Sequence, residues 1–420
     1  MTGIVQSSER EAKPLTREAA LDTIALAAML LFAHGQTTER TIVAAERLGC
    51  TLGVPVRVLP YWGELTVEIE GTSVSQIVPV KPLGVDMGKV HAITTVVDNV
   101  CNGTLRAEVA RAALAAAGHL PSASTLRFTL FAAVGAASLG VIFGALELTS
   151  LILMALSAAF GALVRRWLSG VSDNPLIQPL SAAAIAGVVA SVAGRLQLSD
   201  GIALVAFCPC MVLVPGPHLL NGAIDLARTR IALGITRLVY ACLIVLMICA
   251  GLLIGFTIGG ATLSPAGPSA PVPLAAGGAV AAFGTFFSMP WRQLPIPIIA
   301  GMLAHAVRWA LISFAGANVA IAAFVACILV SVIVTPVVDR WHLPFAALAF
   351  SAVVSMMPGF YLFHAARGVI ELVSIGPTAP ASLLTAIAAN GATAFLIVMA
   401  MTFGLILPRM LFERFLPAPA

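Results

Sequence analysis

Two Pro-Gly pairs in strongly apolar sequence, each followed by an acidic residue, are the residues best placed to do chemistry in this chain. Proline removes a backbone donor and glycine permits turns closed to other residues, so each pair can break a helix and free backbone groups for a ligand. Ionisable side chains are costly in hydrocarbon and are therefore candidates for a substrate or ion path. The candidates are Pro215, Gly216, His218, Asn221, Asp225, Pro358, Gly359, Tyr361, His364 and Glu371.

Simpler roles are open for the same residues. Each Pro-Gly pair can also end a membrane span in an ordinary turn, and each acid can be a solvated helix end. The histidines can relay protons because their ordinary pKa lies near neutrality, or they can simply face water. The acids Asp225 and Glu371 are suited either to proton coupling or to contact with a substrate ammonium group across an interface.

The two Pro-Gly pairs belong to an internal repeat of the sequence. Residues 203–219 and 346–362 align without gaps, and six of these 17 positions are identical, including both Pro-Gly pairs. With five spans in each half, the second half is inverted relative to the first. Inverted repeats of this kind build alternating-access transporters whose substrate site lies at the repeat interface. The first Pro-Gly pair is then expected near the cytoplasm and the second near the outside.

The charge distribution separates a soluble segment from a membrane segment. Of 420 residues, 59% are hydrophobic and 10% are charged, and 22 of the charged residues lie in the first 126 positions. Soluble domains carry about a quarter charged residues, so the remainder reads as membrane protein. Ten apolar runs are long enough to cross a bilayer: 127–146, 148–164, 178–194, 199–215, 234–258, 274–290, 294–313, 317–337, 343–358 and 382–407.

The predicted fold is a polytopic α-helical membrane protein with a small cytoplasmic α+β N-terminal domain. Its divisions are the cytoplasmic domain at 1–126, a first five-helix repeat at 127–258, an extracytoplasmic loop at 259–273 and a second five-helix repeat at 274–420. With both termini cytoplasmic, nine arginines fall inside and two outside, as the positive-inside rule requires. The first 20 residues mix acids and bases and do not resemble a secretory signal. We expect a multi-pass protein of the bacterial inner membrane.

The N-terminal domain has an ααβββαα pattern. Helical periodicity predicts helices at 16–34, 38–48, 86–101 and 104–118, and period-two patterns predict short strands near 56–59, 65–69 and 74–78. It contains no nucleophile elbow, HExxH, Walker or GxGxxG motif. A regulatory or structural role is therefore expected, and the chain is not expected to be an enzyme.

Other classes of function find little support in the sequence. A net charge of +4, scattered along the chain, does not suggest nucleic acid. The seven cysteines are read as small buried hydrophobes, and we expect no cofactor and no metal. A channel would be a symmetric oligomer with a pore-lining repeat, which the sequence of one chain cannot show. Assembly into a homo-oligomer stays open. The expected partners are a small-molecule substrate and the lipid bilayer.

Four segments resemble the threonine/serine exporter family of bacterial and fungal membrane proteins. They are Gly35–Arg40, Val214–Asp225 with its Pro-Gly…Asn-Gly…Asp pattern, Phe283–Pro290 and Met357–Gly359. The resemblance implies ten spans, a cytoplasmic N-terminal domain and proton-driven export of small amino acids. Related split systems, in which the second half is a separate polypeptide, are linked to dicarboxylate export. The alternatives are a succinate-like dicarboxylate exporter and a membrane-bound hydrolase.

Overall fold

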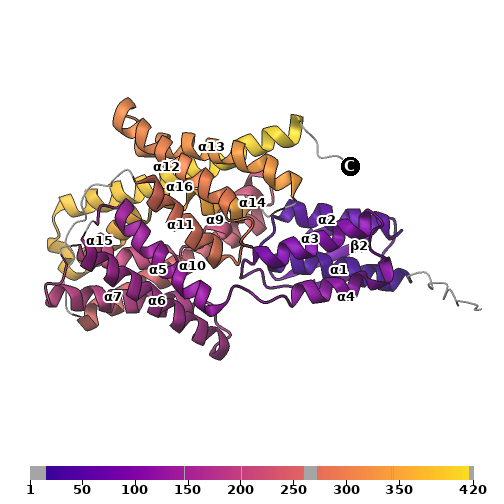
Figure 1. Cartoon of the computed structure of the whole chain (residues 1–420), viewed down its shortest axis with the longest axis horizontal. Helices are drawn as coiled ribbons and strands as arrows, with labels where there is room; N and C mark the ends of the chain where they lie inside the picture. Colours follow the sequence, from indigo (N-terminus) through magenta and orange to yellow (C-terminus); the bar gives the residue numbers. More distant parts are fainter. Residues whose placement is uncertain are drawn as a thin grey trace, which may run out of the picture.

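The chain folds into an N-terminal domain at one end and a helical bundle that makes up the rest (Figure 1). The computed structural model describes residues 16–415 except 146, 200, 260–271, 342 and 344. Most of the predicted extracytoplasmic loop at 259–273 lies outside the described residues. Two hydrophobic cores match the two parts, one within the N-terminal domain and one within the bundle.

The N-terminal domain has the predicted order of two helices, three strands and two helices. Its elements are α1 (Arg17–Ala33), α2 (Thr38–Thr51), β1 (Val56–Pro60), β2 (Glu64–Ile69), β3 (Ser75–Pro79), α3 (Met87–Cys101) and α4 (Ala107–Gly118). The strands form an antiparallel meander in which Val58 pairs with Val67 and Leu65 with Val78. Thr16 caps α1 by accepting a hydrogen bond from the Ala19 amide, as its residue type predicts. The α+β prediction is therefore confirmed for this domain.

Every predicted apolar run contains at least one helix. The helices of the bundle are α5 (Thr125–Ile142), α6 (Leu148–Val171), α7 (Ile177–Arg195), α8 (Ile202–Met211), α9 (Gly216–Ala227), α10 (Ile231–Gly259), α11 (Pro273–Phe286), α12 (Pro295–Ala315), α13 (Val319–Arg340), α14 (Phe345–Val353), α15 (Gly359–Ile375) and α16 (Ala381–Phe415). Short 3-10 turns, η1 (Val354–Met356) and η2 (Gly376–Thr378), follow α14 and α15. The chain is thus a polytopic helical protein.

The runs 199–215 and 343–358 do not each form a full span. Among the described residues, seven helices are long and apolar enough to cross a membrane, and the bent pair α8–α9 makes an eighth. Helix α8 has ten residues, about 15 Å at 1.5 Å per residue, which is roughly half of a hydrocarbon core. Helix α14 is shorter still, and α11 has 14 residues. The count of ten spans stays a prediction.

The two halves of the bundle use the same set of helix contacts. In the first half α5 packs on α6, α6 on α7, and α7 on α10; the corresponding pairs in the second half are α11–α12, α12–α13 and α13–α16. Helix α8 begins at Ile202 and its counterpart α14 at Phe345, while α9 begins at Gly216 and its counterpart α15 at Gly359. In both cases the two starting residues are separated by the interval of the sequence repeat. Between the halves, α8 contacts α15 and α9 contacts α14. The sequence repeat is therefore matched by a repeat of helix order and packing.

The N-terminal domain packs on one end of the bundle. The Met87 amide donates to the Phe287 carbonyl at 2.9 Å, just beyond α11, and the Arg40 guanidinium donates to the Leu343 carbonyl at 3.2 Å, just beyond α13. Glu39 pairs with Arg228 and Arg230 between α9 and α10. The ends of α9, α11 and α13 and the start of α10 therefore lie on the face of the bundle that contacts the N-terminal domain. The predicted topology places all of these segments on the inside.

Candidate functional site

Both Pro-Gly pairs separate two helices inside the bundle. Helix α8 ends at Met211 and α9 begins at Gly216, with a bend of 57° between them. The corresponding break runs from Val353 through η1 to Pro358, and α15 begins at Gly359. All residues of both breaks are buried, so their backbone groups face protein rather than lipid.

Each break packs against the opposite half of the bundle, and the membrane faces near which the two Pro-Gly pairs lie stay a prediction. Gly216 lies against the Phe350 ring of α14, and Gly359 lies against Met211 of α8. A small cavity of about 20 Å³ is lined by both Gly216 and Met357. Each break therefore lies buried inside the bundle, in contact with the other half.

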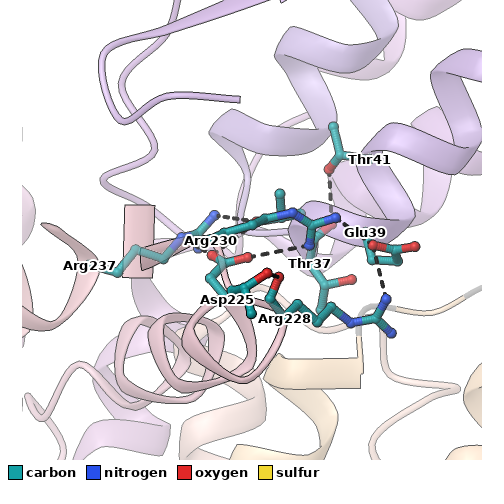
Figure 2. Close-up of polar contacts among 9 residues, drawn as sticks. Thr37, Glu39, Thr41, Asp225, Arg228, Arg230 and Arg237 are labelled. Atoms are coloured by element: carbon teal, nitrogen blue, oxygen red, sulfur yellow. Dashed lines mark hydrogen bonds and ion pairs between the residues drawn. The ribbon is translucent and has the colours of Figure 1, made fainter. Parts of the chain in front are cut away.

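Asp225 forms the centre of a buried ion network (Figure 2). Its side chain and that of Arg237 on α10 are each 1% exposed, and the Asp225 Oδ2 atom lies 3.1 Å from Arg237 Nε. The Thr38 hydroxyl, at the start of α2, donates to the same Oδ2 at 3.0 Å. Removal of one partner from a buried ion pair of this kind strongly destabilises the folded protein, because the other charge is left buried without compensation.

A second layer of charges surrounds this pair at the domain interface. Glu39 accepts a hydrogen bond from Arg230 Nη2 at 2.6 Å and pairs with Arg228 at 3.0 Å. Arg40 forms an ion pair with Asp339 at the end of α13. The first turn of α2 thus contacts both halves of the bundle, through Glu39 on one side and Arg40 on the other.

His218 and Asn221 connect the first break to the N-terminal domain. The His218 Nε2 atom lies 3.3 Å from the Leu83 carbonyl oxygen. The His218 ring packs edge-on against Tyr240, with ring centroids 5.0 Å apart. Asn221 donates to the Gly35 carbonyl at 3.4 Å. Gly35 has a φ of +89°, and a Cβ there would crowd Val85, so its turn suits glycine alone. Loops of the N-terminal domain therefore reach almost to the break.

The second-half candidates occupy a different environment. His364 packs on Phe360 with ring centroids 4.3 Å apart and faces Phe207 of α8, while Tyr361 is half-buried beside it. Glu371 is exposed on α15. The two acids expected to be symmetric are therefore not equivalent, because the N-terminal domain covers only Asp225.

A cavity of about 460 Å³ lies between the N-terminal domain and the first break. Residues of the domain loops, of the break and of the end of α6 all contribute to its lining, among them Asp86, Leu213, His218 and Arg165. The cavity places polar and charged groups beside the backbone that the Pro-Gly pair frees. Among the described residues, no three His, Cys, Asp or Glu side chains group so as to hold a metal ion.

Comparison of the sequence with models of protein families shows which family the chain belongs to. A family model described as threonine/serine exporter matches residues 22–259, and a second, described as threonine/serine exporter, ThrE, matches residues 274–411. The chain belongs to the threonine/serine exporter family. No curated protein and no solved structure matches it.

The two matched segments of this exporter-family chain correspond to structural units. The first covers the N-terminal domain and the helices up to α10, and the second runs from α11 into α16. The Thr38–Asp225 contact lies within the first segment, whereas the ion pair of Arg40 with Asp339 joins the two. Two expectations from the resemblance, a fused two-part chain and a multi-pass membrane protein, are thereby confirmed.

Several site residues of this family member were not singled out by the sequence. Arg237 and Arg228 are among the arginines that the positive-inside count places inside, and Thr38 is the first residue of the helix predicted at 38–48. The hydrogen bonds of Thr38 with Asp225 and with Arg237 join residues 187 and 199 positions apart. The one available signal was the Gly35–Arg40 segment, whose likeness to the family motif marks the start of α2.

The Glu39 cluster makes interface stability depend on pH. Burial alone would raise the pKa of Glu39, but the guanidinium groups of Arg230 and Arg228 outweigh it and hold that pKa below its ordinary value. A depressed carboxylate pKa gives stability that is present above the unfolded-state pKa and lost as pH falls through the folded-state pKa. We expect the melting temperature of the full-length protein in detergent to decrease once the pH is lowered below about 4.5.

Replacement of the carboxylate tests this expectation. Glu39→Gln is expected to lower the melting temperature at neutral pH and to make its fall under acid conditions shallower. Glu68→Gln, at a carboxylate on β2 within the same domain, is the matched control and should leave both unchanged. An acid transition as steep in Glu39→Gln as in the wild type would contradict the assignment.

Proposed function

We propose that the protein is a secondary active exporter of threonine or serine, coupled to the proton gradient across the bacterial inner membrane. The observation that carries this proposal is the pair of buried helix breaks that meet between two halves with the same helix contacts. Family membership supports the substrate class. A path bordered by both breaks can open to one face or the other as the halves rock.

Inverted symmetry of the halves belongs to this proposal. Residues 127–258 and 274–407 are proposed to be related by a rotation of about 180° around an axis in the membrane plane. The starts of corresponding helices are separated by one constant interval, from Ile202 to Phe345 and from Gly216 to Gly359, which supports a repeat. An odd number of spans in each half would invert it.

Asp225 is proposed as the proton-coupling group. It is the acid of the first Pro-Gly segment, it is buried, and its partner Arg237 lies on the adjacent helix. Protonation of Asp225 would remove the charge that holds Arg237 and Thr38 together with α9. Because Thr38 belongs to the N-terminal domain, the same event would loosen the contact between that domain and the bundle.

Export assays in cells that lack their own exporters test the substrate. Cells that express the protein are expected to release labelled threonine and serine faster than cells with an empty vector. Labelled succinate is the comparison, because a dicarboxylate exporter is the alternative function. Release of succinate without release of threonine or serine would overturn the amino-acid assignment, and collapse of the proton gradient should stop export if coupling is correct.

Topology provides a separate prediction. With both termini cytoplasmic, a reporter fused after Ala420 that works only in the periplasm is expected to be inactive, and one fused within the 259–273 segment is expected to be active. The arginine distribution and the single face that carries the N-terminal domain support this orientation. Activity of the C-terminal fusion would refute it.

A further inference from the structure

The cavity beside the first break is lined by more cations than acids. Its lining includes Lys89, Arg165 and Arg166 but a single acid, Asp86. Burial, and next the charge of Lys89, lowers the pKa of His34, which also lines the cavity, so this ring is neutral at pH 7. The cavity therefore carries an excess of positive charge.

Two of the charged groups are already engaged. Arg166 Nη2 donates to the Ala123 carbonyl at 2.6 Å. Asp86 accepts from the Lys89 amide at 3.1 Å, where it caps α3, and from the Ser122 hydroxyl at 2.6 Å. These contacts hold the linker before α5 against the cavity wall. Arg166 and Asp86 therefore have structural roles.

Arg165 differs from both of these groups. Its guanidinium lies over the Phe286 ring at 4.7 Å and near the Phe128 ring at 5.6 Å from the centroid. Its Nε atom is buried and has no hydrogen-bond partner in the described part of the chain. A buried donor without a partner is costly, so the arrangement is suited to a ligand that supplies the acceptor.

Arg165 also stands between two cavities. It lines the 460 Å³ cavity and a smaller one of about 20 Å³ that is bordered by Ser157, Pro209 and Leu213. Ser157 lies two helical turns before Arg165 on α6, and its buried hydroxyl has no partner among the described residues. The guanidinium is therefore at the point where the space below the N-terminal domain narrows toward the broken helix.

We propose that Arg165 binds the carboxylate group of the exported metabolite on its way from the cavity to the first break. A guanidinium presents parallel donors that match a carboxylate, and the two aromatic rings fix its plane. The inference rests on the proposed function for the direction of transport, but the chemistry it names is shared by an amino acid and a dicarboxylate. The excess positive charge of the cavity favours any ligand with a carboxylate.

Binding to the full-length protein in lipid nanodiscs, measured by calorimetry, tests the assignment. The probes are threonine, serine, succinate and threoninol, which is threonine with its carboxylate replaced by an alcohol. Wild-type protein is expected to bind at least one carboxylate probe and to bind threoninol at least about tenfold more weakly than threonine. In Arg165→Gln this preference for the carboxylate is expected to vanish, and Arg165→Lys should retain part of it.

Arg127→Gln is the matched control. Arg127 lies at the same end of the bundle, but it stacks on Trp291 and donates to the Met289 carbonyl, and it lines neither cavity. Its loss should leave the carboxylate preference intact. A gel-filtration profile equal to that of the wild type shows that Arg165→Gln is folded, and Arg165→Lys serves if it is not.

The outcomes separate this proposal from the proposed function. If Arg165→Gln keeps the full preference for threonine over threoninol, the site is wrong while export of threonine can stand. If only succinate binds, and does so through Arg165, the site stands and the amino-acid assignment falls. Absence of binding by every carboxylate probe in the wild type, or loss of the preference in Arg127→Gln alone, would overturn the site.

Discussion

Asp225→Asn is expected to reduce threonine export at least about tenfold and to abolish the dependence of the remaining export on external pH, while the protein still reaches the membrane. The Asp225 carboxylate is buried between Arg237 and the Thr38 hydroxyl, and a neutral amide can neither bind nor release a proton there. Export by the wild type and the variant across a series of pH values measures the effect.

A loss of folding must be separated from a loss of coupling. Asp225→Asn alone leaves Arg237 charged and buried, which costs about 3–5 kcal/mol in comparable buried pairs. The double variant Asp225→Asn/Arg237→Met removes both charges and is expected to recover most of the thermal stability but none of the pH dependence. If the double variant exports threonine with the wild-type pH profile, the pair is structural.

Glu371→Gln is the matched comparison from the second half. Glu371 occupies the corresponding segment after the second Pro-Gly pair but is exposed, and the N-terminal domain does not cover it. Coupling confined to Asp225 predicts near-normal export and an ordinary pH profile for this variant. Equal loss in Asp225→Asn and Glu371→Gln would instead support two symmetric coupling groups.

Local pattern was enough to predict the order of the elements. Capping residues, period-two strands and apolar runs depend on residues close together in sequence, so the ααβββαα domain and a helix in every apolar run could be read directly. The repeat was visible because Pro-Gly pairs are rare in apolar sequence. The Asp225–Arg237–Thr38 network could not be read, because it joins α9, α10 and α2 through tertiary contacts.

The contact of each break with the opposite half also escaped prediction, for a geometrical reason. Apolar runs such as 199–215 were counted as whole spans because hydropathy does not record where a helix stops. The run contains only ten residues of α8 before the chain bends, and the bend places Gly216 against α14. Hydropathy alone therefore predicts neither the end of α8 nor the contact of Gly216 with α14.

Gly216→Ala is expected to block export almost completely, whereas Gly359→Ala is expected to leave most of it. A Cβ atom at Gly216 would overlap the Phe350 ring, which is buried among other aromatic side chains and has little room to move. A Cβ atom at Gly359 would lie 3.1 Å from Met211 Cγ, and a flexible methionine can shift by the few tenths of an ångström required. Overpacking of this kind costs about 1–3 kcal/mol where the neighbour cannot yield.

A compensating substitution shows whether the close contact between the halves is the cause. Phe350→Leu removes the outer ring atoms that the new methyl group would meet, so Gly216→Ala/Phe350→Leu is expected to regain export that Gly216→Ala lacks. Gly391→Ala, at a helical glycine of α16 with open space around it, is the control for the substitution itself. Normal export by Gly216→Ala would mean that the first break does not border the substrate path. Equal loss in Gly216→Ala and in its double variant would place the defect in the backbone of the break rather than in its contact with α14.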